Sequence, residues 1–387
     1  MKVCLTSPYL YPAVIGGAEK YVYSLACSLR NMDLDVVVIT STPSSVFPKN
    51  PLEDFDVVFL KSAFRLGVNP ITPTLFKAIK QEKPDIVHTQ APTITADLSL
   101  LSCKSLRIPI ISTYHASITR SSVPHALLAF YDVMHNNFTL KQCNHIIATT
   151  ERYKTMLQRV GLRENKISVI PVGIERDFVE AEISREVKER FESLISRLGY
   201  NPSSIILFVG ALDRYHMYKG MDKLLAAFKM VVNKYPDSLL IVVGDGDQRS
   251  FYEMLCKQLR LVRNTLFVGF VSRESLIAFY SFSNLFILPS VSFSEGFGTV
   301  LLEAMSRGCP VVTTIYAGGA EIVRKEKAGG VISSIDPFSL SQKIIYFIEN
   351  ADFAKKCGKN GIQAVRQKYT WDSISAKVLE IYKRYAN

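Results

Sequence analysis

Two glutamates in one short segment have the residue type and spacing to hold a ligand that carries hydroxyl groups. Seven residues separate Glu295 from Glu303 within Pro289–Met305, and a Gly-Phe-Gly turn between them precedes a helix predicted to begin near Thr299. One carboxylate then lies before the helix and the other about one turn inside it, with backbone N–H groups between them. Carboxylates accept hydrogen bonds from vicinal sugar hydroxyls, and the N–H groups favour phosphate. A chance pair of glutamates is common, whereas the whole segment with its glycines is not.

A loop with two basic residues offers a second place for phosphate. The segment Val209–Gly220 follows a predicted strand, precedes a predicted helix, and contains Arg214 and Lys219. Arginine presents a fixed fork of donors and lysine a point charge, so together they could surround a diphosphate. A solvated basic loop is the alternative interpretation.

Further candidates follow predicted strands in the first half of the chain. Gly16 and Gly17 precede a helix, where they would let backbone N–H groups approach an anion, although a plain strand-to-helix turn has the same pattern. His115 follows a strand and could donate a hydrogen bond to a sugar hydroxyl or shield developing positive charge. A hydrogen-bonded structural histidine is the alternative for His115, and the same ambiguity applies to His88.

Alternating strand and helix patterns along the chain predict an α/β fold. The strand candidates are short, β-branched and continuous, as in sheets buried on both faces. They are residues 36–40, 57–60, 86–88, 108–113, 146–148, 167–170, 205–209, 239–243, 266–268, 285–288 and 310–313. The alternation predicts two doubly wound (Rossmann-like) sheets with helices on both faces. Because ligands bind at the carboxyl ends of such strands, we expect two domains that face each other across a cleft.

The chain is long enough for two domains. At 387 residues it exceeds the usual domain size of ~100–200, and we place the boundary near Pro171–Gly173. The N-terminal domain then spans residues 1–172 and the C-terminal domain residues 173–370. A charged helical pattern at 182–198 and a new strand at Ile205 follow the boundary.

Composition restricts the class of protein. Hydrophobic residues at 48% and charged residues at 21% exclude a wholly disordered chain. The net charge of +11 comes without a nucleic-acid motif, so we expect no nucleic-acid partner; the charge fits a basic soluble protein, an anionic membrane surface or a phosphate-bearing substrate. Seven cysteines without a CxxC pair argue against a disulfide framework or structural zinc, and for a reducing cytosol.

One segment suggests contact with a membrane surface. Lys61–Leu66 mixes basic and apolar residues, which is the basis for peripheral association at the inner membrane face. An ordinary loop is the alternative, since six residues are too few for a clear amphipathic helix. The uncharged stretch Ser275–Ser294 contains six serines and a proline and divides into a helix and a strand, so we do not interpret it as a membrane span.

The segment with the two glutamates resembles the E-x7-E motif of retaining nucleotide-sugar glycosyltransferases of the GT-B fold, most closely family four. The agreement extends along nearly the whole chain. The supporting positions are Gly16–Gly17, His115, the Gly210–Gly220 loop, Gly244–Gly246, Gly269–Val271, Gly318–Gly319 and Trp371. The resemblance implies a sugar transfer from a nucleotide-diphosphate sugar to a glycan or lipid-linked acceptor.

The resemblance also implies roles for the donor site. Glu303 would bind the ribose hydroxyls of the donor, and Glu295 would hold the transferred sugar. Lys219 would neutralise the diphosphate leaving group, which Gly16 and Gly17 would approach from the other domain.

Other implied positions surround the sugar and the base. His115 would face the sugar, and Phe297 and Gly298 would supply backbone contacts nearby. Phe270 and Val271 would lie beside the nucleotide base. The final helix, residues 371–387, would cross back to the N-terminal domain.

One position departs from the family pattern. The family usually has an arginine after the glycine that ends the strand, and this chain has Ala211, so Arg214 or His216 would have to supply the missing charge. The mechanism that the resemblance implies is metal-independent retention without a cofactor, in which the protein stabilises an oxocarbenium-like state and a departing phosphate.

Two other classes of function fit the same residues. A nucleotide-sugar epimerase or a sugar phosphorylase could share the fold, and a non-catalytic protein could keep a nucleotide-sugar site or use its basic surface at a membrane. Release of nucleoside diphosphate only in the presence of an acceptor would distinguish transfer from epimerisation. We expect acceptor choice to lie in the loops at 41–54 and 116–124.

Overall fold

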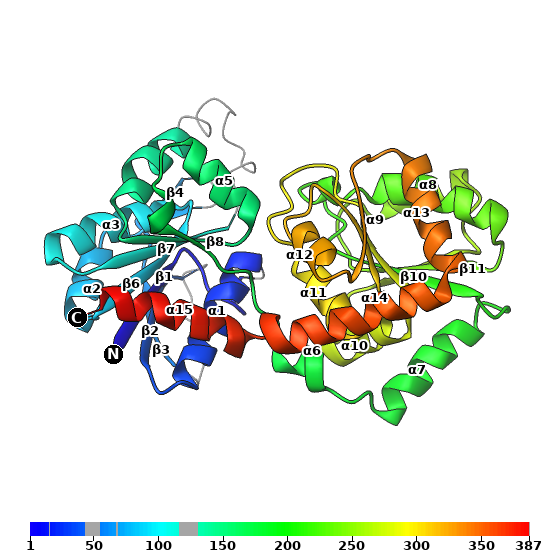
Figure 1. Ribbon diagram of the computed structural model, residues 1–387, viewed down its shortest axis with the longest axis horizontal. Helices are drawn as coiled ribbons and strands as arrows, with labels where there is room; N and C mark the ends of the chain where they lie inside the picture. The colour runs from blue at the N-terminus through cyan, green and yellow to red at the C-terminus, as the bar shows by residue number, and fades with distance from the viewer. Residues whose placement is uncertain (15, 43–54, 67–68, 116–130, 387) are drawn as a thin grey trace. The chain divides into compact units, whose positions relative to one another are not determined.

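A computed structural model describes residues 1–14, 16–42, 55–66, 69–115 and 131–386. The chain forms two compact units, one of Met1–Gly173 together with Trp371–Asn387 and one of Ile174–Thr370 (Figure 1). The division thus falls one residue after the position that the sequence suggests. Of the two expected acceptor loops, residues 43–54 and 116–124 lie outside the described residues.

A seven-stranded parallel sheet forms the centre of the first unit, with strand order β3-β2-β1-β6-β7-β8-β9. Its strands are β1 (Lys2–Ser7), β2 (Asp35–Ser41), β3 (Asp56–Leu60), β6 (Ile86–Ala91), β7 (Ile110–Tyr114), β8 (His145–Ala148) and β9 (Ile167–Val169). All residues of β6, β7 and β8 are buried, because helices cover both faces of the sheet. A separate antiparallel hairpin joins β4 (Phe64–Leu66) to β5 (Asn69–Ile71).

The helices of the first unit include the last helix of the chain. Those within the described residues are α1 (Gly17–Arg30), α2 (Leu75–Glu82), α3 (Ile94–Leu106), the π-helix η1 (His135–Leu140), α5 (Glu151–Arg159), the short η2 (Glu164–Lys166) and α15 (Trp371–Tyr385). Helix α15 buries Trp371, Ile374, Val378 and Tyr382, a helical spacing that gives it one apolar face. That face packs beside α1 (Figure 1). There the rings of Tyr21 on α1 and of Trp371 lie 5.1 Å apart.

The second unit has a six-stranded parallel sheet with strand order β12-β11-β10-β13-β14-β15. Its strands are β10 (Ser204–Val209), β11 (Ser238–Val243), β12 (Thr265–Gly269), β13 (Leu285–Leu288), β14 (Val311–Thr314) and β15 (Gly329–Ile332). The sequence pattern misses β15 because the strand begins with two glycines. A Cβ at Gly329 would collide with the carbonyl oxygen of Val311 on the neighbouring strand, so this edge requires glycine.

Helices flank this second sheet. They are α6 (Arg176–Glu180), α7 (Arg185–Ser196), η3 (Met217–Lys219), α8 (Met221–Lys234), α9 (Arg249–Gln258), α10 (Arg273–Phe282), α11 (Thr299–Ser306), α12 (Ala320–Lys325), α13 (Pro337–Glu349), α14 (Ala351–Ala364) and η4 (Val365–Tyr369). Local signals start two of them: the Ser272 hydroxyl accepts from the N–H of Ser275 in α10, and Asp336 caps α13 ahead of Pro337. The chain is therefore an α/β protein with two Rossmann-like parallel sheets, as predicted.

Two other sequence expectations concern the membrane and the thiols. In the part of the chain that the structure describes, no helix combines the length and the apolar character needed to span a bilayer. All seven cysteines carry free thiols, and six of them are buried.

Candidate functional site

The carboxyl edge of the second sheet brings Lys219 and Glu295 together. Lys219 follows β10, and Glu295 lies in the loop between β13 and α11. The Lys219 Nζ lies 2.8 Å from Glu295 Oε2, and the side chains are 12% and 8% exposed. A charge-assisted hydrogen bond at this distance is strong, and removal of Lys219 would leave the buried Glu295 carboxylate without this cation. The structure thus couples the basic loop to the E-x7-E segment.

Glycines allow the basic loop to reach that position. Gly220 has a φ of 73°, and a Cβ there would collide with the Pro289 carbonyl oxygen in the loop after β13. The N–H of Val291 donates to the Tyr218 carbonyl over 2.7 Å, which ties the two loops together. A Cβ at Gly210 would lie 2.8 Å from Cδ of Lys219, so this glycine makes room for the lysine stem.

Glu303 lies on α11 and is 6% exposed. Its Oε2 accepts a hydrogen bond of 2.8 Å from the hydroxyl of Tyr280, which is fully buried on α10. Burial, and then the Glu303 charge, hold the pKa of Tyr280 well above its ordinary value, so the phenol stays neutral and donates. Gly298 caps α11 with a φ of 79°, a left-handed conformation that suits glycine. Sequence reasoning found both glutamates but not Tyr280.

The two candidates for the charge missing at Ala211 have partners of their own. The Arg214 side chain is 67% exposed, and its Nε donates to Asp247 Oδ2 over 2.8 Å. Asp247 also accepts from the backbone N–H of Arg214 over 2.9 Å. The ring nitrogen Nδ1 of His216 lies 2.8 Å from Asp213 Oδ1. To contact a diphosphate, each side chain would have to bind it and the carboxylate partner at the same time.

Gly244 and Gly246 serve loop packing. Both have positive φ values, 129° and 157°, and a Cβ at Gly244 would collide with the Gly210 carbonyl oxygen. The N–H of Leu212 donates to the Asp245 carbonyl over 2.9 Å. The glycines therefore let the loop after β11 lie against the loop after β10.

The residues expected beside the nucleotide base have different surroundings. Phe270 follows β12 with 81% of its surface exposed, so its ring is available for stacking. Val271 lines an apolar cavity of about 290 Å³ together with Phe191 of α7 and Phe279 of α10.

Phe297, which is expected to contact the sugar through its backbone, is buried. Its carbonyl oxygen accepts a hydrogen bond of 2.6 Å from the N–H of Gly319.

In the first unit, His115 directly follows β7 at the carboxyl edge of the sheet. Its Nε2 lies 2.7 Å from Gln90 Oε1, and the edge of the Tyr21 ring packs against it at 4.8 Å. Burial lowers the pKa of His115 to about 4, so the imidazole is neutral near pH 7. A neutral imidazole can both donate and accept a hydrogen bond.

His88 has a structural role. It lies inside β6, fully buried, with Nδ1 2.6 Å from the Tyr382 hydroxyl of α15 and Nε2 2.7 Å from Thr113 Oγ1. Burial lowers the pKa of His88 to about 3. Both ring nitrogens are engaged, which supports the structural interpretation and shows how α15 is held to the first sheet.

Gly16 and Gly17 lie at the start of α1, but a carboxylate lies there too. Gly16 is the N-cap residue with an extended φ of −154°, and a Cβ there would collide with Oε2 of Glu19. Burial raises the pKa of Glu19. Nothing lies within 4 Å of a Cβ built on Gly17. Sequence reasoning did not include Glu19 among the candidate site residues, although an acid in the first turn of a helix is a recognised N-terminal signal.

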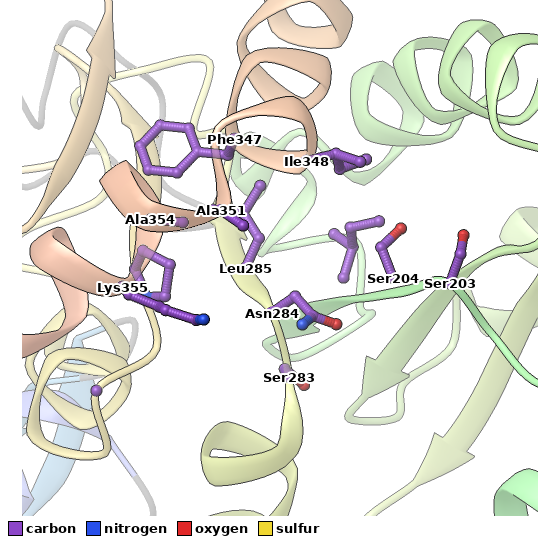
Figure 2. Close-up of a pocket in the computed structure, with 13 residues that line it drawn as sticks. Ser203, Ser204, Ser283, Asn284, Leu285, Phe347, Ile348, Ala351, Ala354 and Lys355 are labelled. Carbon is purple, nitrogen blue, oxygen red and sulfur yellow. The ribbon is translucent and has the colours of Figure 1, made fainter.

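A separate cavity lies at the opposite edge of the second sheet. It measures about 280 Å³ and is lined by residues near the amino ends of β10 and β13, among them Ser204, Asn284 and Leu285, and by Lys355 of α14 (Figure 2). None of the predicted site residues lines it. This cavity is therefore separate from Lys219 and Glu295, which lie at the carboxyl edge.

Two family models match the chain. Residues 192–364 match the model described as glycosyl transferases group 1, and residues 15–178 match the model described as glycosyltransferase family 4.

Three curated relatives carry related names. An uncharacterized glycosyltransferase of Methanocaldococcus jannaschii is 29% identical over 63% of this chain and 61% of its own length. The O-antigen chain mannosyltransferase C of Escherichia coli is 25% identical over 99% of this chain and 98% of the relative. The phosphatidyl-myo-inositol mannosyltransferase of Mycobacterium tuberculosis is 25% identical over 100% and 97%.

A solved structure shares the fold. The Anabaena protein HepE, solved in complex with UDP, superposes with a TM-score of 0.79 at 19% identity, over 99% of this chain and 100% of that one. The likeness shows an architecture of two Rossmann-like domains of the GT-B type.

Proposed function

Because this chain belongs to the group 1 (family 4) glycosyltransferases, we propose that it transfers a hexosyl residue from a nucleotide-diphosphate sugar to a glycan or lipid-linked acceptor, with retention of anomeric configuration. The glycosyltransferase assignment follows from the two family models and the relatives. What we propose beyond that assignment is the class of sugar donor, the retention of configuration and the kind of acceptor.

The observation that carries the proposal is the buried ion pair of Lys219 and Glu295. Transfer leaves negative charge on the departing diphosphate, and an ammonium group in a largely water-excluded position stabilises that charge more strongly than one in water. Glu295, held at a fixed place by the lysine, can accept a hydrogen bond from a hydroxyl of the transferred sugar.

The proposed mechanism requires neither a metal nor a cofactor. Lys219 and the backbone N–H groups at the start of α11 supply positive charge for the phosphates. The acceptor attacks the face that the diphosphate leaves, and the protein stabilises the oxocarbenium-like state; we assign no carboxylate nucleophile. His115, neutral near pH 7, is the candidate hydrogen-bond partner of a sugar hydroxyl.

Donor recognition is assigned to Glu303 and Phe270. The buried Glu303 carboxylate would accept from the ribose hydroxyls, and the exposed Phe270 ring would stack on the base. Two full-length relatives are mannosyltransferases, so we propose a mannosyl or related hexosyl donor. One of these relatives acts, by its name, on a phosphatidylinositol, which supports a lipid-linked acceptor as one option.

We further propose peripheral association with an anionic membrane surface from the cytosolic side. The hairpin strand β4 exposes Phe64 and Leu66, at 60% and 57%, around Arg65. Apolar side chains beside a cation suit the interface of an anionic bilayer. The seven free thiols fit a reducing compartment. Co-sedimentation with phosphatidylglycerol vesicles at low salt, lost in Phe64→Ser/Leu66→Ser, tests the proposal; equal sedimentation of wild type and variant contradicts it.

The reaction is tested by incubating the purified chain with GDP-mannose or UDP-glucose and a panel of glycan and polyprenyl-phosphate acceptors. We expect nucleoside diphosphate to be released only when an acceptor is present, in the presence or absence of EDTA, and the product to keep the anomeric configuration of the donor by NMR. Release without an acceptor, or an inverted product, contradicts the proposal. Conversion of the donor sugar into its epimer supports the epimerase alternative.

A further inference from the structure

We propose that Tyr280 is a positioning residue of the donor site, whose hydroxyl holds the Glu303 carboxylate in the orientation that binds ribose hydroxyls. The inference rests on the proposed function, because it takes Glu303 as the ribose ligand. Neither the spacing of the motif nor the family resemblance pointed to this tyrosine.

The first argument is the bond itself. The hydroxyl of Tyr280 donates to Glu303 Oε2 over 2.8 Å, and the bond joins the last turn of α10 to the middle of α11. Because the pKa of Tyr280 lies well above its ordinary value, the phenol remains protonated wherever the protein is folded near neutral pH. The phenol hydroxyl is therefore always available as a hydrogen-bond donor, and it orients one oxygen of the Glu303 carboxylate.

The second argument is that packing fixes the tyrosine. Tyr280 is fully buried, and its ring meets the ring of Phe286 on β13 edge-on at 5.5 Å. The ring of Phe178 on α6 lies 6.4 Å away, also edge-on. Elements on two sides hold the phenol, so its hydroxyl has little freedom to follow a moving carboxylate.

The third argument compares the two glutamates of the motif. Lys219, a cation, holds Glu295, whereas a neutral phenol holds Glu303. Burying a carboxylate without a hydrogen-bond donor costs free energy of folding. The terminal torsion angle of a glutamate side chain has no sharply preferred value, so a neighbouring group must set the orientation of the carboxylate. A phenol donates to the carboxylate without bringing a positive charge of its own. The Tyr280 bond therefore leaves Glu303 able to accept from ligand hydroxyls as well.

The decisive variant is Tyr280→Phe, which keeps the ring and removes the hydroxyl. We expect calorimetry with UDP or GDP, whichever the wild-type chain binds, to show a Kd raised about tenfold, a loss typical of one hydrogen bond to a charged group. With the matching 2′-deoxynucleotide, which lacks one of the two hydroxyls, the Kd should change by less than about threefold between wild type and variant. A merely structural role for Tyr280 would weaken both nucleotides equally.

Tyr252→Phe is the matched control. Tyr252 is a tyrosine of the same unit, on α9, and only 2% exposed; among the described residues, its hydroxyl makes no hydrogen bond to a carboxylate. We expect Tyr252→Phe to bind both nucleotides as the wild type does.

A second variant makes the test independent of any loss of stability in Tyr280→Phe. In a Glu303→Ala background, addition of Tyr280→Phe should leave the Kd unchanged, because Tyr280 acts only through Glu303. Additive losses in the double variant, or unchanged ribonucleotide binding by Tyr280→Phe alone, overturn the inference while the proposed function stands. If the wild-type chain binds neither UDP nor GDP, the donor proposal fails, and the inference fails with it.

Discussion

Lys219 and Glu295, 76 residues apart in the sequence, form an ion pair of 2.8 Å in which neither side chain is more than 12% exposed. The pair joins the loop after β10 to the loop after β13, and both loops follow strands that are neighbours in the sheet. Both groups are expected to contact the nucleotide-sugar donor, so substitutions in this pair should change both the free energy of unfolding and the turnover.

The two glutamates of the motif should respond differently to substitution. Glu303→Ala removes the expected ribose acceptor and should weaken nucleoside diphosphate binding by about tenfold or more, whereas Glu295→Gln should keep that affinity and lower turnover by about a hundredfold. Calorimetry and steady-state kinetics on both variants measure the two effects. Equal effects of the two substitutions on free nucleotide and on nucleotide sugar would contradict the assigned roles.

Removal of the lysine should cost both stability and activity. Lys219→Met leaves the Glu295 carboxylate buried without its cation, so we expect the free energy of unfolding to fall by about 3–5 kcal/mol in urea titrations. Turnover should be lost as well, because the leaving diphosphate loses its counter-charge.

The double variant Lys219→Met/Glu295→Gln separates these two effects. It removes both charges, so stability should return to within about 1–2 kcal/mol of the wild type while turnover stays lost. Recovery of activity together with stability would show that the lysine is only a structural partner of Glu295.

The lack of a side chain at Gly220 should matter for two reasons: the backbone has a positive φ there, and the Pro289 carbonyl oxygen occupies the place of a Cβ. Gly220→Ala places a methyl group against the Pro289 carbonyl oxygen at a φ of 73°, and we expect it to destabilise the protein by about 3 kcal/mol or more. Gly199→Ala is the control, because Gly199 has a φ of 71° with nothing within 4 Å of the added Cβ, and should cost only about 1 kcal/mol. Similar losses in both variants would mean that the contact with the Pro289 loop is unimportant.

Stability should fall between pH 7 and pH 5 because of His115. Its pKa is about 4 in the folded protein, below the ordinary value of 6.5, so the unfolded chain binds the proton first as the pH falls. The histidine's contribution is complete above pH 6.5 and is lost progressively towards pH 4. We expect a loss on the order of 2 kcal/mol between pH 7 and pH 5 from this group alone.

Urea titrations at both pH values, on the wild type and on His115→Gln, measure that contribution. The variant cannot titrate at this position, so its loss between pH 7 and pH 5 should be smaller by about 2 kcal/mol. His88 remains in both proteins, and its pKa is lowered to about 3 chiefly by burial and only secondarily by His115, so its own contribution should nearly cancel in the comparison. Identical pH dependence of the two proteins would rule out a depressed pKa for His115.

The sequence by itself determined the architecture and which residues are candidates for the site. Continuous β-branched runs that alternate with helical patterns specify buried parallel strands, and all eleven predicted runs lie wholly or mostly within observed strands of the two parallel sheets. Gly298 and Glu303 lie close to Glu295 along the chain, so a local motif was enough to find them. The local mixture of basic and apolar residues at Lys61–Leu66 also indicated a surface segment, and Phe64 and Leu66 are exposed in the structure.

Only the tertiary structure decided which residues touch. The partners Lys219 and Glu295, Tyr280 and Glu303, and His88 and Tyr382 are separated by 76, 23 and 294 residues. Whether such side chains meet depends on strand order, on register and on how helices pack over the sheet, and none of these has a local signature. For the same reason the sequence left His88 ambiguous and missed Tyr280, since a buried hydrogen bond is recognisable only when both partners are in place.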